Sequence, residues 1–69
     1  TVAELLYRTA KHHYDEKHNN ATKNSDIEVV KDLGPAHNHL TWLMDSLDPF
    51  SESADYLIAW ISSIHPEKS

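Results

Sequence analysis

The segment EVVKDLGPAHNHLTWL, residues 28–43, decides the fold of this chain. It contains the chain's one glycine, Gly34, directly before Pro35, and apolar residues recur every three or four positions on either side of the pair. A glycine commonly ends a helix in the left-handed conformation, and a proline fits the first position of a helix, where no N–H is needed. The segment therefore predicts two helices that meet at a corner at Gly34.

The same apolar spacing continues on both sides of this corner and predicts an all-α protein. The expected helices cover residues 2–18, 26–33, 35–47 and 51–65, which makes a compact small bundle of three longer helices and one short one. Residues 19–24 are polar, lack periodicity and are expected to form a loop. The residues expected to face the core are Ala3, Leu6, Ala10, Tyr14, Ile27, Val30, Leu33, Ala36, Leu40, Leu43, Met44, Leu47, Ala54, Leu57, Ile58, Ile61 and Ile64.

Capping residues and a proline mark the expected helix ends. Ser25 and Glu28 have the spacing of a capping box, which predicts that the short helix begins after Ser25. Pro66 is expected to end the last helix, because the residue before a proline is driven out of helical geometry. The alternative caps at the start of the last helix are Asp48, Ser51 and Ser53.

Length and composition describe one small acidic domain over residues 1–69. The chain carries 6 Lys and Arg against 11 Asp and Glu, a formal net charge of −5, and no cysteine. Such a short chain has a small core and marginal stability. It lacks the clustered positive charge that non-specific binding to nucleic acid needs. No apolar run is long enough to span a membrane, and no targeting segment or cysteine is present, which together predict a cytoplasmic protein.

Six histidines suggest metal or proton binding as an alternative function. His12, His13 and Glu16 lie within one turn of a predicted helix, so their side chains can meet on its surface. A zinc or nickel site would need further converging ligands, and no known zinc spacing is present. A metal- or pH-responsive module would also use His37 and His39. We find no catalytic motif, phosphate-binding loop or cofactor motif, and therefore expect neither an enzyme nor a bound cofactor.

The corner at Gly34 also has the spacing of a helix-turn-helix, which supplies a second alternative. In that arrangement the helix from residue 35 would be the recognition helix of a DNA-binding transcriptional regulator. Its lack of lysine and arginine is an objection, because phosphate contacts supply much of the affinity for DNA. The residues that would contact DNA are Lys31, His37, Asn38, His39 and Thr41.

Aromatic side chains at the edges of the expected core favour a different function. Trp42 lies opposite the leucine face of its helix, and tryptophan and tyrosine are enriched at binding hot spots. The competing interpretation is that a neighbouring helix covers Trp42 and makes it a core residue. The preferred hypothesis is an acidic regulator or adaptor that binds a protein partner, with self-association through the same aromatic residues as a further expectation. The partner-binding residues would be Asn38, His39, Trp42, Tyr56 and Trp60.

Overall fold

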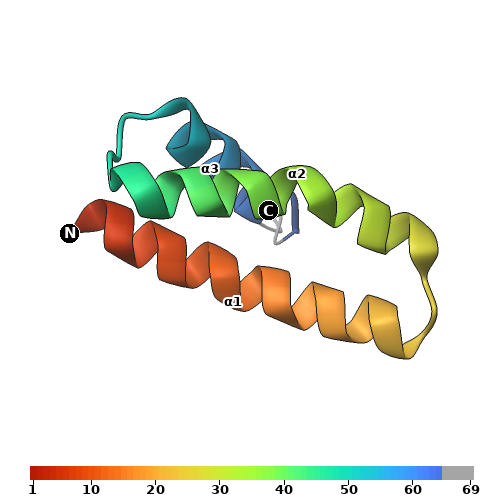
Figure 1. The fold of residues 1–69 in the computed structure, drawn as a ribbon. Helices are drawn as coiled ribbons and strands as arrows, with labels where there is room; N and C mark the ends of the chain where they lie inside the picture. Colours follow the sequence, from red (N-terminus) through yellow and green to blue (C-terminus); the bar gives the residue numbers. More distant parts are fainter. Residues whose placement is uncertain (65–69) are drawn as a thin grey trace, which may run out of the picture.

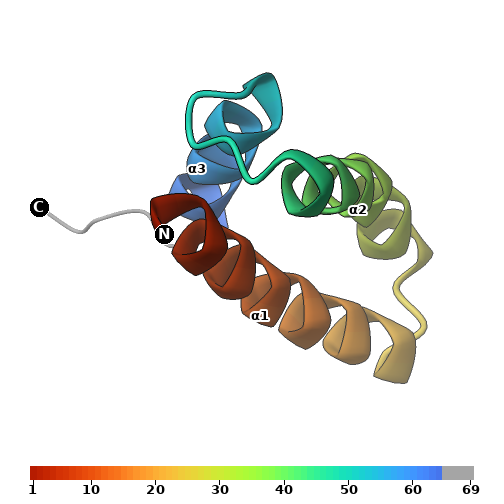
Figure 2. The same ribbon diagram turned by 60° about the vertical axis from the view of Figure 1, so that its left-hand side comes forward.

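The computed structural model describes residues 1–64, which fold into three α-helices (Figure 1). They are α1 (Val2–Lys23), α2 (Ile27–Ser46) and α3 (Glu52–Ile64). The helices α1 and α2 lie side by side and run in opposite directions, and α3 packs against both of them (Figure 1, Figure 2). The all-helical fold class is confirmed, but the separate short helix is not present, because it is the first part of α2.

The corner predicted at Gly34 is wrong, since α2 continues through it and carries Pro35 in its interior. Gly34 does not adopt a positive φ. A proline inside a helix costs about 3 kcal/mol relative to alanine. Each buried leucine contributes about 1.5–3 kcal/mol, so burying three of them on one helix face outweighs that cost. The buried residues that share this face are Leu33, Ala36, Leu40 and Leu43.

Glycine at position 34 makes the passage through the proline less costly. Proline disfavours the helical region for the residue before it, because its ring crowds that residue's Cβ. Gly34 has no Cβ and avoids this contact. In Figure 1 the ribbon of α2 changes direction along its length near this point, as helices commonly do at a proline.

The first helix extends beyond its predicted end. It continues to Lys23, through the polar residues whose composition predicts a loop. The reason is Ala21, which is buried at 4% exposure and extends the alanine face begun by Ala3 and Ala10. The chain then turns at once, and the Asp26 N–H donates to the Ala21 carbonyl at 2.8 Å.

The second helix begins one residue later than the predicted capping box requires. Asp26, and not Ser25, is the N-cap, and its Oδ1 accepts the Val29 N–H at 3.2 Å. Ser25 has a φ of 54° in the left-handed region and belongs to the turn. The box between Ser25 and Glu28 is therefore wrong, although the type of cap, an oxygen that accepts a free backbone N–H, is the one expected.

The second helix ends close to its predicted boundary but in an unusual conformation. Leu47 follows Ser46 with φ 49° and ψ 34°, and its N–H donates to the Leu43 carbonyl at 2.7 Å. This left-handed conformation is normally taken by glycine or asparagine, because a Cβ is crowded there. A leucine at this position places local strain at the C-terminal end of α2.

Ser51 is the cap of the last helix among the three alternatives. Its Oγ accepts the Ala54 N–H at 3.1 Å. Asp48 instead accepts a backbone N–H within the connection, at 2.9 Å. The observed helix, residues 52–64, agrees with the expected 51–65 at its start. The last residue of that expected helix and the stop at Pro66 lie outside the described residues.

The core is small and rich in alanine. Most residues with the expected spacing are buried or partly buried, but five of them are exposed. Four of these five lie in the first or last turns of α2 or at its cap, where the helix reaches the ends of the bundle. The exposed five are Ile27, Val30, Met44, Leu47 and Ile58. The core consists of Ala3, Ala10, Leu40, Leu43, Ala54 and Leu57, with Leu6, Tyr7, Tyr14, Tyr56, Trp60 and Ile61 packed against it.

Pro35→Ala tests the continuity of α2. Alanine restores an N–H for the Lys31 carbonyl and removes the crowding by the ring, so we expect the free energy of unfolding to rise by about 1–3 kcal/mol. Thermal and urea unfolding followed by circular dichroism measure the change. If Pro35 instead began a helix after a corner, the variant would be neutral or slightly less stable, because proline is favourable at that position.

Candidate functional site

Three aromatic side chains from α2 and α3 form a row. The ring of His39 stacks on that of Tyr56, with centroids 4.0 Å apart and planes 20° from parallel. His39 also meets Trp42 edge to face, with centroids 5.1 Å apart and an interplanar angle of 87°. We call Trp42, His39 and Tyr56 the aromatic row. All three belong to the predicted partner-binding set, and the packing of α2 on α3 brings them together.

Ser53 holds the middle ring of the aromatic row in place. It is buried at 7% exposure, and its Oγ lies 3.1 Å from Nδ1 of His39. Either the hydroxyl donates to a bare nitrogen or the ring N–H donates to the hydroxyl oxygen, according to the tautomer. The sequence marks Ser53 only as an alternative helix cap. Its role beside His39 depends on how two helices pack, which spacing along one helix does not give.

The remaining two residues of the predicted set each lie one helical turn from a member of the aromatic row, Asn38 from Trp42 and Trp60 from Tyr56. Trp60 is partly buried against the core and lines a hollow that Lys17 and Leu33 also line. Asn38 is exposed on α2. Trp42 keeps 54% of its surface exposed. The interpretation that a neighbouring helix covers Trp42 is therefore wrong.

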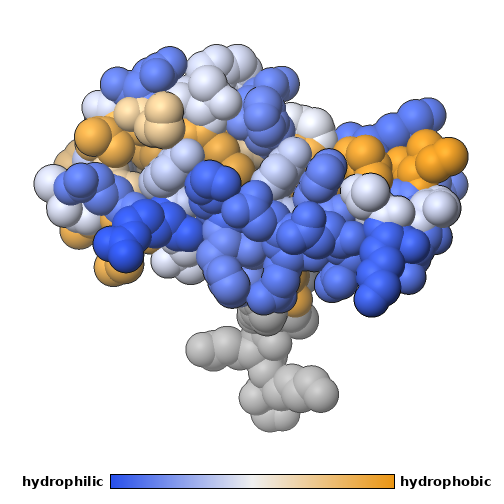
Figure 3. Space-filling model, turned by 60° about the horizontal axis from the view of Figure 1, so that its bottom comes forward, coloured by the Kyte–Doolittle hydropathy of each residue, from blue (hydrophilic) through white to orange (hydrophobic). Residues whose placement is uncertain are grey.

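More large apolar side chains are exposed than buried among residues 1–64. The large buried ones are four leucines, Leu33, Leu40, Leu43 and Leu57, whereas nine large apolar residues are exposed. Figure 3 shows hydrophobic surface at both ends of the molecule, separated by a hydrophilic stretch along α1. Four of the nine surround the C-terminal end of α2, namely Trp42, Met44, Leu47 and Phe50.

Carboxylates without an ion-pair partner among residues 1–64 lie near this end of α2, and the nearest hollow has Arg8 in its wall. Residues 40–64 contain no lysine, arginine or histidine. Their four carboxylates have no ion-pair partner among the residues that the structure describes, whereas the pairs Lys11–Asp15 and His12–Glu16 lie within α1. The dipole of α2 adds negative charge at its C-terminus, and its last turn has no basic residue. We call the exposed residues around this helix end, Trp42, Met44, Asp45, Leu47, Asp48 and Phe50, the acidic end; Trp42 lies on its α3 side, and Met44 lies on its α1 side.

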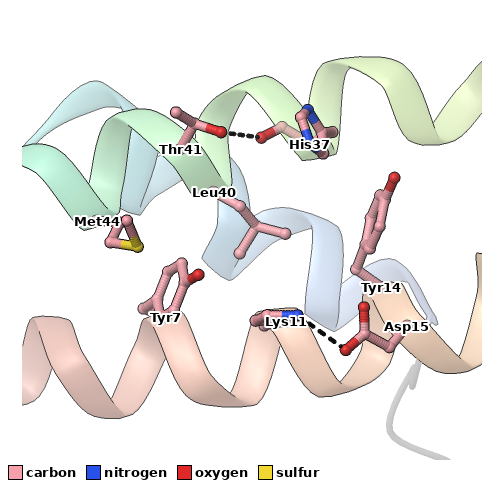
Figure 4. Close-up of a pocket in the computed structure, with 8 residues that line it drawn as sticks. All are labelled: Tyr7, Lys11, Tyr14, Asp15, His37, Leu40, Thr41 and Met44. Carbon is pink, nitrogen blue, oxygen red and sulfur yellow. Dashed lines mark hydrogen bonds and ion pairs between the residues drawn. The ribbon is translucent and has the colours of Figure 1, made fainter.

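A groove of about 340 Å³ lies between α1 and α2, and the spacing of residues along the sequence does not predict it (Figure 4). The helical spacing of Tyr7 and Tyr14 places both on one face of α1, which is a signal for an aromatic wall. That α2 leaves room beside this wall depends on the packing of the two helices. The lining residues are Tyr7, Lys11, Tyr14, Asp15, His37, Leu40, Thr41 and Met44.

Polar groups of this groove bond to one another. The Lys11 Nζ lies 3.0 Å from Asp15 Oδ2, and this hydrogen bond raises the pKa of Lys11. The Thr41 hydroxyl donates to the His37 carbonyl at 3.2 Å. The first of these bonds lies within α1 and the second within α2, so neither joins the two walls of the groove. The groove therefore offers mainly aromatic and apolar contact.

The predicted metal ligands form a pair rather than a site. His12 Nε2 lies 3.1 Å from Glu16 Oε2, one helical turn away, and the His13 ring stands edge-on to that of His12. Within residues 1–64, no group of three or more histidine, aspartate or glutamate side chains is arranged to hold a metal ion. A structural zinc ion needs four ligands, so the arrangement lends no support to the metal hypothesis.

The DNA-binding alternative loses the corner that suggested it. The residues expected to contact DNA face different neighbours, since His37 and Thr41 line the groove beside α1 whereas His39 faces α3. No separate recognition helix follows Gly34, so the helix-turn-helix interpretation of residues 28–43 is wrong. All the residues expected to contact DNA belong to the single continuous helix α2: Lys31, His37, Asn38, His39 and Thr41.

Comparison with protein-family models, with curated proteins and with solved structures gave no match. In the part of the chain that the structure describes, no helix has the length and apolar character needed to cross a membrane. The candidate functional surfaces are the aromatic row and the acidic end.

The two tryptophans should differ in their response to ionic quenchers of fluorescence. In Trp60→Phe, which leaves Trp42, we expect strong quenching, with caesium favoured over iodide because carboxylates concentrate cations nearby. In Trp42→Phe, which leaves Trp60 beside Lys17, we expect weaker quenching without this preference. Each quencher is normalised to its effect on a free tryptophan derivative. Equal quenching of both variants, or a preference for iodide at Trp42, would contradict the structure.

Proposed function

We propose that the protein is a small helical interaction module, a regulator or adaptor, that binds a protein partner through the aromatic row and the acidic end. The observation that carries the proposal is the excess of exposed over buried large apolar side chains. Single exposed apolar residues are ordinary on protein surfaces. Four around one helix end, including Phe50 at 89% exposure, are typical of a surface that another protein covers.

The order within the aromatic row supports this function. Immobilising a flexible side chain on binding costs about 0.5–1.5 kcal/mol. His39 is already held by Ser53 and by the stacked ring of Tyr56, so a partner meets a ring that needs no further ordering. Trp42 stands beside it, more than half exposed, and tryptophan is among the residues that contribute most at interfaces.

Self-association is a second candidate, and it is favoured at the opposite end of the molecule. Ile27 is 69% exposed, and with Val30 and Ala21 it lines an apolar hollow of about 410 Å³ at the turn between α1 and α2. Two copies that meet there keep their acidic ends apart, and Asp26 is the one charged residue among those that line the hollow. Partner binding and self-association would then use separate surfaces.

Trp42→Ala and Ile27→Ala test the two surfaces against each other. Partners are captured from an extract on the immobilised wild-type protein and on each variant, and are quantified by mass spectrometry. We expect Trp42→Ala to reduce capture at least about tenfold, as the loss of a hot spot does, and Ile27→Ala to leave it unchanged. Light scattering measures the mass of each protein, and circular dichroism confirms that each is folded.

The outcomes separate the two candidates. Capture no greater than on a blank resin, or capture that Trp42→Ala leaves intact, would overturn the proposed partner surface. Loss of an oligomer only in Ile27→Ala would assign self-association to the other end, whereas a monomeric wild-type protein would exclude the second candidate.

A further inference from the structure

We infer that the acidic end binds a cationic amphipathic segment of a partner protein, one that carries lysine or arginine beside an apolar face. The inference rests on the proposed function and specifies its partner. Three features of the acidic end support it: strain at an exposed leucine, a hollow next to that leucine, and the carboxylates of Asp45 and Asp48, which form no ion pair among the described residues.

Leu47 supports a contact outside the chain. It adopts the left-handed conformation, in which glycine is the favoured residue, and its side chain is 43% exposed. A leucine here strains the backbone and is only half covered within the chain. A partner that covers the exposed half would supply the stabilisation that the chain itself does not provide.

A hollow beside Leu47 fits an apolar side chain of the partner. Its volume is about 220 Å³, and Tyr7 and Met44 line it together with Leu47. Glu4 and Arg8 form the remaining wall. The hollow thus joins the end of α2 to the start of α1 and gives a partner helix a place to insert an apolar residue between two elements.

The charges at this end select a cationic partner. Asp45 and Asp48 alternate along the chain with the exposed residues Met44, Leu47 and Phe50, so apolar and acidic groups are interleaved around this helix end. Asp45 also lies in the last turn of α2, where the helix dipole disfavours a carboxylate. A lysine or arginine placed here interacts at once with the carboxylates and with the free carbonyls of the helix end.

The same charges argue against the other occupants. Nucleic acid and anionic membranes carry the sign of charge that this surface carries and would be repelled. A second copy of the chain would bring one acidic end against another. A protein segment with positive charge and an apolar face is complementary in both respects.

Three synthetic peptides of about 18 residues test the inference on the full chain. The first is an amphipathic helix with lysine and arginine on its polar face, the second replaces these residues by glutamine, and the third scrambles the first. Binding is measured by titration of the amide and indole NMR signals. We expect the first peptide to shift Trp42 and its neighbours and to bind at least about tenfold more tightly than the others at low salt.

Charge variants sharpen this test. Asp45→Asn should lower the affinity for the cationic peptide about threefold, which is the scale of one exposed charge pair. Asp32→Asn removes a matched exposed carboxylate in the first half of α2 and should leave this affinity unchanged. Raising NaCl from about 0.02 to 0.5 M should remove most of the advantage over the glutamine peptide.

Each contrary result overturns a stated part of the inference. Equal affinity for the glutamine peptide would refute the cationic partner, and equal affinity for the scrambled peptide would refute the amphipathic one. No shift at about 1 mM peptide, or shifts confined to other surfaces, would overturn the inference as a whole. The capture experiment with Trp42→Ala tests the proposed function separately. If no peptide binds but partner capture still depends on Trp42, the protein remains an interaction module with a different kind of partner.

Discussion

The burial of one continuous face of α2 is the interaction on which the rest of the structure depends. Leu33 and Leu43 lie on opposite sides of Gly34 and Pro35, and they share that face only because the helix keeps its phase through the proline. The same phase places His39 opposite Ser53 on α3. A break at the proline would rotate the second half of α2 relative to the first. The position of the aromatic row is therefore set by the way in which the helix passes Pro35.

Alanine in the core connects the small interior to the apolar surface. Ala3, Ala10 and Ala54 allow the helices to approach closely, but each removes much less apolar area from water than a leucine would. Among the described residues, Leu43 and Leu57 are the largest side chains that are fully buried. The larger apolar residues that such a core leaves no room for lie outside it, around the helix ends. A partner that binds only the folded form would stabilise the chain by mass action.

Apolar spacing predicts the faces of the helices well, and local stop signals predict their boundaries poorly. Ala36, Leu40 and Leu43 are buried as their spacing requires, because a periodic stripe reports directly on packing. Gly34 with Pro35 is a strong local signal for a corner, but burial across the pair outweighs it. Trp42 is correctly placed outside the leucine face of α2. Its neighbours His39 and Tyr56 also belong to the predicted set. The hydrogen bond between Ser53 and His39 is not predicted, because it depends on how α2 packs against α3, which the spacing of residues along one helix does not determine.

Local rules are kept in α1 and broken at the end of α2, and this contrast supports the proposed partner surface. Helix α1 begins with a capping box, ends with a lysine in its last turn and carries, each across one turn, the Lys11–Asp15 ion pair and the His12–Glu16 contact. The end of α2 has a leucine in the left-handed conformation and places Asp45 at the negative end of the helix dipole. Its last turn contains no basic residue to offset the carboxylate or the dipole. Two independent unfavourable features within three residues are hard to explain by folding alone. Residues whose conformation or charge is unfavourable for the fold are commonly found at functional sites. At the end of α2, contact with a partner would supply the compensating stabilisation.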